Sequence, residues 1–241
     1  MRRLLPAATL LAAAALPLAL AACSSGSATA PAPGGMTATP PVAPPAANPD
    51  AGLLTGTQLK ELLEPASYFP SGFRRNPAGT RDTGPGYQPP STTRVPKPKC
   101  RLLGATSWTS ITGIDGVSFA QDDYIDKASS AEIAQEIDVY RGTTALTVMR
   151  KLGTISAACR SYTDAQTGSR AEVSEKARPR LGDSGYVITV TDPAWRSGST
   201  LVAARVGTAV VTVLSTDGAD NGHASAMKLT AHLVAALRGN A

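Results

Sequence analysis

Histidine and cysteine are scarce in this chain of 241 residues, which contains two histidines and three cysteines. His223 and His232 are nine residues apart. On a helix this spacing is two and a half turns and places the two side chains on opposite faces. A Cys/His metal site needs ligands that converge on one point. The sequence therefore predicts no metal site and no cofactor.

Recognisable catalytic signatures are also missing. No G-x-S-x-G nucleophile motif occurs. Asp122 and Asp123 are adjacent in a predicted strand, so their side chains point to opposite faces and do not form a glycosidase pair by themselves. The glycines of residues 182–185 precede a strand rather than a helix, unlike a phosphate-binding loop. We therefore expect a protein that is not an enzyme.

A large excess of one charge is absent as well. Arg2 and Arg3 lie in an N-terminal segment that is predicted to be cleaved off. Without them the chain has 21 basic and 18 acidic residues and a net charge of +3. This mild charge argues against a nucleic-acid partner. Residues 94–101 (RVPKPKCR) alternate basic residues with proline. They are interpreted as a solvated loop, the alternative being contact with anionic phospholipid headgroups or wall polymers.

The N-terminus has the layout of a bacterial lipoprotein signal. Arg2 and Arg3 precede an apolar run over residues 4–20, and Ala21-Ala22 stand directly before Cys23. The run is shorter than the ~20 residues of a membrane span and is interrupted by two prolines. The segment resembles a lipobox, the alternative being an ordinary secretory signal that ends in Ala-Cys. Residues 1–22 are thus a predicted signal peptide, and Cys23 is the predicted lipidation site that carries acyl chains such as palmitate.

Residues 23–51 are predicted to tether this lipid anchor to a folded domain. Seven of the 28 residues after Cys23 are proline, none is aromatic, and Asp50 is their single charge. Such a segment buries too little apolar surface to offset its ordering entropy. We expect a disordered tether that holds a domain of residues 52–241 at the extracytoplasmic face of the cell membrane.

Cys100 and Cys159 remain once Cys23 is assigned to lipid. Outside the cytoplasm an isolated pair of cysteines usually oxidises, so we predict a disulfide bond between them. A bond that closes a loop of this length contributes about 4 kcal/mol in the chain-entropy model.

The hydrophobic periodicity predicts an α+β domain, a twisted antiparallel sheet with helices packed on one face. The pattern between residues 65 and 99 is that of a long loop, and residues 101–111 are ambiguous but compatible with a helix. Gly207-Thr208 is predicted to join two strands as a hairpin. Helices are predicted over residues 57–64, 143–159 and 222–237, and strands over 117–125, 133–140, 170–176, 186–191, 201–206 and 209–214.

The order of these elements resembles the PknH-like extracellular sensor domain family over roughly residues 53–238. The resemblance is carried by LKELL near the start, the proline-rich approach to Cys100, SFAQDDYI, and Ala157-Ala158-Cys159. It implies a twisted antiparallel sheet with a cleft for a small ligand, here in a standalone lipoprotein. The chain departs from the family in having a single cysteine pair in this region and Ser156 three residues before Cys159. No cleft residue is transferred.

Trp195 and Trp108 are the candidate ligand-binding residues. Trp195 lies in a turn-rich segment after a strand, although tryptophan usually buries its large surface. Each either folds onto the core or lines a site. The sequence therefore predicts a sensor or ligand-binding lipoprotein for a small molecule or envelope component. The alternatives are an interaction lipoprotein that docks an envelope protein, and an envelope-polymer hydrolase.

The substitution Cys23→Ser tests the anchor, because a serine hydroxyl does not replace the thiol in lipid transfer. We expect the variant to be released or mis-sorted, as measured by membrane fractionation of expressing cells. A variant that stays in the membrane fraction with the mass of the processed wild type would show that the lipobox interpretation is wrong.

Overall fold

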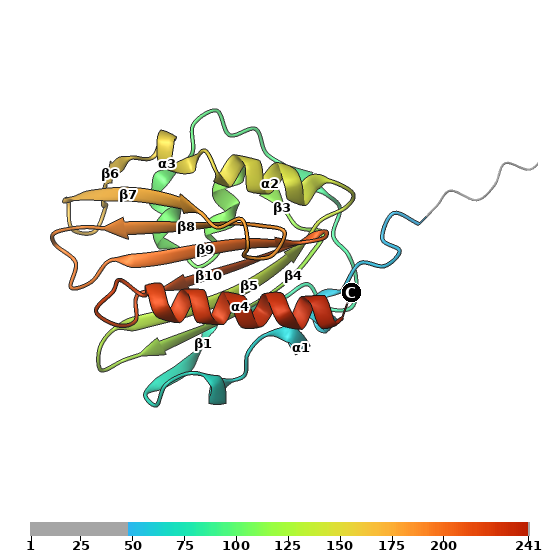
Figure 1. Cartoon of the computed structure of the whole chain (residues 1–241), viewed down its shortest axis with the longest axis horizontal. Coiled ribbons are helices and arrows are strands. Elements are labelled where there is room, and N and C mark those ends of the chain that lie inside the picture. The colour runs from blue at the N-terminus through green and yellow to red at the C-terminus, as the bar shows by residue number, and fades with distance from the viewer. Residues whose placement is uncertain (1–47, 241) are drawn as a thin grey trace, which may run out of the picture. The chain divides into compact units, whose positions relative to one another are not determined.

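The computed structural model describes residues 48–240. The predicted signal peptide, Cys23 and most of the tether lie outside the described residues. An eight-stranded antiparallel sheet forms the centre of the domain, in the order β1-β4-β5-β10-β9-β8-β7-β6 (Figure 1). The predicted fold class is therefore confirmed.

The strands of this sheet are three to ten residues long. They are β1 (Phe73–Asp82), β4 (Ser118–Asp126), β5 (Ala131–Val139), β6 (Ser161–Thr163), β7 (Arg170–Ala177), β8 (Ser184–Thr191), β9 (Ser199–Val206) and β10 (Ala209–Ser215). Two further strands, β2 (Ser91–Thr92) and β3 (Ile114–Asp115), pair with each other in a small separate sheet.

Helices lie before, between and after the strands. The α-helices are α1 (Gly56–Leu62), α2 (Thr144–Leu152), α3 (Ile155–Ala158) and α4 (His223–Gly239). Three 3-10 helices are η1 (Ala66–Tyr68), η2 (Cys100–Gly104) and η3 (Trp108–Thr112). Within residues 48–240, none of the helices has the length and apolar character that crossing a membrane requires.

Helices cover both faces of the sheet, so the prediction of helices on one face is wrong. Val211 and Val213 of β10 face a core built with α1 and α4, whereas Val210 and Leu214 face a second core built with α2, η2 and η3. In Figure 1 the red helix α4 crosses one face, and α2 and the green helical turns lie on the other. The reason is that all seven residues of β10 are buried, and a strand buried on both sides needs two covering layers.

The β9–β10 hairpin has the predicted two-residue turn. Gly207 has a φ of 57°, in the left-handed region that glycine adopts readily. Val206 then pairs with Ala209, and the register continues to Thr200 opposite Ser215. β10 also pairs with β5, from Ala209 opposite Val139. The hairpin thereby fixes the register in the middle of the sheet.

The segment 65–99, predicted to be a long loop, contains a ten-residue strand, β1. Pro77 lies in this strand at a register shift between Asn76 and Arg81. Proline is tolerated there because β1 is an edge strand, where no further ladder bond is required. A Cβ at Gly79 would lie 1.7 Å from an oxygen of Asp123, so the bulge needs glycine to approach β4.

The helix predicted over residues 143–159 is divided into α2 and α3. It breaks at Gly153 and Thr154, where a Cβ on Gly153 would lie 2.5 Å from the Tyr186 hydroxyl of β8. The ambiguous segment 101–111 forms the short helices η2 and η3 rather than an α-helix.

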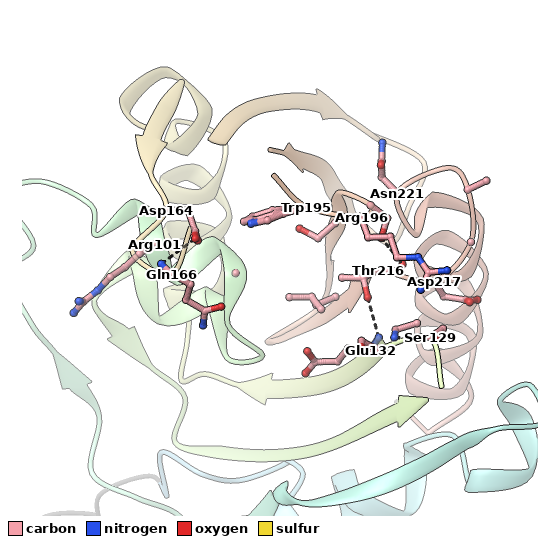
Figure 2. Close-up of a pocket in the computed structure, with 18 of the residues that line it drawn as sticks. Arg101, Ser129, Glu132, Asp164, Gln166, Trp195, Arg196, Thr216, Asp217 and Asn221 are labelled. Carbon is pink, nitrogen blue, oxygen red and sulfur yellow. Dashed lines mark hydrogen bonds between the residues drawn. The ribbon is translucent and has the colours of Figure 1, made fainter. Parts of the chain in front are cut away.

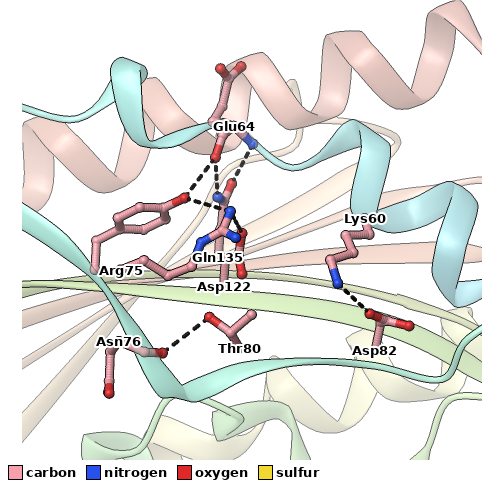
Figure 3. A network of polar contacts seen from close by, with 9 residues as sticks. Lys60, Glu64, Arg75, Asn76, Thr80, Asp82, Asp122 and Gln135 are labelled. Atoms are coloured by element: carbon pink, nitrogen blue, oxygen red, sulfur yellow. Dashed lines mark hydrogen bonds and ion pairs between the residues drawn. The ribbon is translucent and has the colours of Figure 1, made fainter.

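Polar contacts fasten the edge strand and the chain after α1 to the sheet (Figure 3). The Gln135 amide accepts from the backbone nitrogen of Glu64 at 2.9 Å and donates to its carbonyl at 2.8 Å. Arg75 of β1 donates to Asp122 of β4 at 2.8 Å. Gln135 and Asp122 are buried, so these bonds satisfy polar groups that would otherwise destabilise the core.

The predicted disulfide between Cys100 and Cys159 is confirmed, with a Cα–Cα distance of 5.5 Å. Cys100 begins η2, and Cys159 directly follows α3. The bond therefore joins two helical turns on the same face of the sheet.

A double variant, Cys100→Ala/Cys159→Ala, tests the contribution of this bond. The bond closes a separation of 59 residues. We expect the free energy of unfolding to fall by about 4 kcal/mol because the unfolded chain regains conformational entropy. Urea unfolding measures the loss, and wild type under reducing conditions is the matched control. Unchanged stability in both samples would contradict the prediction.

Candidate functional site

A cavity of about 1180 Å³ lies at one end of the sheet. Alternate connections of an antiparallel sheet lie at the same end of its strands. At this end lie the β4–β5, β6–β7 and β8–β9 turns and the β10–α4 loop. The cavity is lined by Arg101, Gly104, Ser129, Ser130, Ala131, Glu132, Tyr162, Asp164, Ala165, Gln166, Trp195, Arg196, Ser197, Ser199, Leu214, Thr216, Asp217, Gly218, Ala219 and Asn221.

Trp195 of the β8–β9 turn lines this cavity. Its side chain is half-buried and packs against the core that includes α2. Its backbone nitrogen donates to the carbonyl of Asp192 at 3.1 Å, and Asp192 Oδ1 accepts from the nitrogen of Ala194 at 2.8 Å. Asp192 also accepts from Ser169 of the β6–β7 turn. Two neighbouring turns are thus bonded together around the tryptophan.

Glu132 lies across the cavity from this turn, at the start of β5 (Figure 2). Its backbone is held on both sides by Thr216, which donates to the Glu132 carbonyl at 2.9 Å and accepts from the Glu132 nitrogen at 2.8 Å. Its carboxylate has no ion-pair or hydrogen-bond partner within residues 48–240. Burial, and secondly the charge of Asp123, raise the pKa of Glu132.

The β10–α4 loop forms a rigid wall of the cavity. Asn221 has a φ of 60°, and its side-chain oxygen accepts from the nitrogen of Gly198 at 2.8 Å. Gly222 has a φ of 80°, and a Cβ there would lie 2.0 Å from the carbonyl oxygen of Ser215. Asp217 accepts from Ser225 of α4 at 2.8 Å. The loop conformation therefore depends on contacts that other residue types would not make.

Two arginines and an aspartate complete the charged lining. Asp164 accepts from the backbone nitrogen and the hydroxyl of Thr167, and also from the backbone nitrogen of Gln166. These bonds, chiefly those of Thr167, lower the pKa of Asp164. Arg101 and Arg196 are exposed, and neither forms an ion pair with the described part of the chain. In Figure 2 the guanidinium of Arg101 points away from the cavity, whereas Arg196 lies beside Thr216 and Asp217.

Ser199 at the start of β9 adds an unusual polar group. Its side chain is 4% exposed and lines the cavity. Its hydroxyl oxygen is buried and has no hydrogen-bond partner among residues 48–240. A buried hydroxyl without a partner is unfavourable, and several other buried polar atoms of the described residues share this condition.

Trp108, the second tryptophan proposed from the sequence, lies elsewhere. It is 0% exposed and belongs to the core built with α2, and it is absent from the cavity lining. Its position therefore gives no support to a ligand-binding role. The residues 94, 97 and 99 of the basic loop are exposed and also lie outside this lining.

Glu132, Asn221 and Gln166 were not identified from the sequence. Each of these residues lies in a turn or next to one. The sequence does not show which turns meet at one end of the sheet. The strand order supplies that information. Asp217 and Asp220, in the turn before α4, were the available signal for this region.

A second polar cluster is buried on the same face of the sheet, beneath η3. Glu136 and Asp138 of β5 share a hydrogen bond between their carboxyl groups. Ser107 donates to Glu136 or to Gln121, both at 2.9 Å. Burial raises the pKa of Glu136 to about 7 and that of Asp123 to about 6, and it also raises the pKa of Asp138.

Burial therefore favours the protonated form of these carboxyl groups. No group of three or more His, Cys, Asp or Glu side chains among residues 48–240 has the geometry of a metal site. His232 instead lies 3.5 Å from Glu64 and stacks edge-on against Tyr68, and His223 begins α4.

Comparison with known proteins shows a structural similarity but no match in sequence. No protein-family model matches the chain, and no curated protein matches it. The crystal structure of the extracellular domain of PknH from Mycobacterium tuberculosis superposes with a TM-score of 0.53. It is 11% identical in sequence, and the similarity covers 77% of this chain and 97% of that chain. The resemblance predicted from the sequence is thereby confirmed for the fold alone.

The buried acid pair predicts an unusual dependence of stability on pH. The folded pKa of Glu136 is about 7, above its ordinary 4.5, so the folded protein keeps a proton that the unfolded chain releases between these values. The free energy of unfolding should therefore decrease as the pH rises from 5 to 7. Glu136→Gln removes this titration, and its amide oxygen still accepts a hydrogen bond from the protonated Asp138 carboxyl.

We expect Glu136→Gln to be more stable than wild type at pH 8, by at most about 3 kcal/mol, and nearly equal at pH 5. Urea unfolding at both pH values measures the difference. Glu172→Gln is the matched control, because the Glu172 side chain is 60% exposed. Equal stability of wild type at pH 5 and pH 8, together with no effect of Glu136→Gln, would contradict the prediction.

Proposed function

We propose that this protein is a non-catalytic sensor or ligand-binding lipoprotein. In this proposal Cys23 carries the lipid, the tether spans part of the cell envelope, and residues 52–241 bind a small molecule or envelope component outside the cytoplasm. The observation that carries it is the cavity around Trp195. A concave site with an aromatic side chain, a few converging polar groups and a perturbed pKa is the usual form of a ligand site.

Two further observations support the extracytoplasmic location. The disulfide between Cys100 and Cys159 is of a kind that persists in oxidising compartments. The similar solved structure is described as the extracellular domain of PknH. A standalone lipoprotein needs a separate protein to carry any signal across the membrane.

Trp195→Ala tests the binding role of the cavity. Trp195 is half-buried, so we expect a loss of stability below the ~3–5 kcal/mol typical of truncating a buried tryptophan. Trp108→Ala is the matched control, since Trp108 is fully buried and should lose that full amount. Urea unfolding of the two variants separates a cavity residue from a core residue.

Native mass spectrometry of the mature protein, purified from its own host, supplies the binding measurement. A retained ligand appears as a mass increment on wild type, and we expect Trp195→Ala to reduce it. If Trp195→Ala is as destabilised as Trp108→Ala and the increment is unchanged, the site assignment is wrong.

A further inference from the structure

We propose that the ligand of this cavity is a carbohydrate, with a sugar ring stacked on Trp195 and its hydroxyl groups bonded to Glu132 and the neighbouring turns. This inference rests on the proposed function and narrows it to one chemical class. It depends on three features of the described residues: one aromatic surface, polar side chains without a partner in the protein, and mixed charge without a dominant sign.

The aromatic surface is provided by Trp195, assisted by Tyr162 of β6. Figure 2 shows the indole ring between the Asp164–Gln166 side of the cavity and the Arg196–Asn221 side. Hydrogen bonds at Asp192 hold the turn, and the ring packs against the core on one side. A sugar presents a face of C–H groups that packs against such a ring, while its hydroxyl groups stay at the ring's edge.

Those hydroxyl groups need partners, and the cavity contains several that are not used within the protein. The Glu132 carboxylate and the Gln166 side-chain amide have no partner among residues 48–240. The Ser199 hydroxyl has none either, but its oxygen is buried below the cavity surface. A carboxylate only accepts, a hydroxyl donates and accepts, and an amide does both. Neighbouring sugar hydroxyls, each a donor and an acceptor, match this set.

The same lining disfavours other ligands. An acyl chain needs a long apolar surface, but the large apolar or aromatic residues here are Trp195, Tyr162 and Leu214. A phosphate group needs a net positive site, but Glu132, Asp164 and Asp217 outnumber the two arginines. The volume of about 1180 Å³ exceeds the ~300–1,000 Å³ of most small-ligand pockets and leaves room for more than one sugar ring.

The two tryptophans make a direct test possible. Trp108 is fully buried, so a ligand-induced change in tryptophan emission reports on Trp195. The purified protein is titrated with trisaccharides of glucose, mannose, galactose, arabinose and N-acetylglucosamine, and with trialanine and inorganic phosphate for comparison. We expect at least one trisaccharide to give a saturable blue shift and to protect the emission from acrylamide.

Glu132→Gln should weaken the binding of that trisaccharide about tenfold or more, because an amide replaces a charged acceptor. Glu172→Gln, on an exposed part of β7, is the matched control and should leave the affinity unchanged. Trp195→Phe keeps an aromatic face and should retain binding by calorimetry, whereas Trp195→Ala should lose it.

The proposal is overturned if no trisaccharide saturates, if trialanine or phosphate alone does, or if Glu132→Gln binds as tightly as wild type. This failure is distinguishable from failure of the proposed function. A non-carbohydrate mass increment that Trp195→Ala removes would refute the sugar and leave the binding function in place. An increment that is insensitive to Trp195→Ala would argue against both.

Discussion

Burial of the β9–β10 hairpin on both faces is the constraint on which the rest of the structure depends. An antiparallel sheet often leaves one face in water, and its strands then alternate apolar and polar residues. β10 reads AVVTVLS and has no exposed residue. Its two faces need two covering layers, which α4 and α1 supply on one side and α2 with η2 and η3 supply on the other. A helix as short as η2 is not stable by itself. The disulfide stabilises it by joining it to the end of α3 within the second layer.

The same topology gathers the candidate site. Once the hairpin fixes the register, the β4–β5, β6–β7 and β8–β9 turns and the β10–α4 loop all emerge at the opposite end of the sheet from Gly207. A hydrogen bond from Gly198 to Asn221 joins the β8–β9 turn to the β10–α4 loop. Another, from Ser169 to Asp192, joins the β6–β7 turn to the β8–β9 turn. The cavity wall is therefore bonded across elements that are far apart in sequence. A preformed wall of this kind lowers the entropy that a ligand must offset on binding.

Much of the fold follows from local sequence patterns, and the exceptions have physical reasons. The hairpin at Gly207-Thr208, the strand YVITVT and the C-terminal helix were predictable because turn chemistry and periodicity agree there. β1 was not predictable, because Pro77 and Gly79 disfavour a regular strand. They are compatible with one only where an edge strand contains a bulge, as β1 does. Trp195 was predictable as a candidate from its surroundings. Glu132 was not, because its role depends on which turn lies opposite, and Trp108 could not be told from Trp195 without knowing its burial.

The same arrangement also decides where the chain enters the folded domain relative to the cavity. Asp50 accepts two hydrogen bonds from Arg141, at 2.6 and 2.8 Å, and Arg141 lies just after the end of β5. That end of the sheet carries the Gly207 turn, whereas the cavity lies where β5 begins, so the chain enters the domain at the far end from the cavity (Figure 1). The ion pair at Asp50 holds the last residues before α1 against the domain at that end. The described start of the chain is therefore fastened far from the residues that line the cavity.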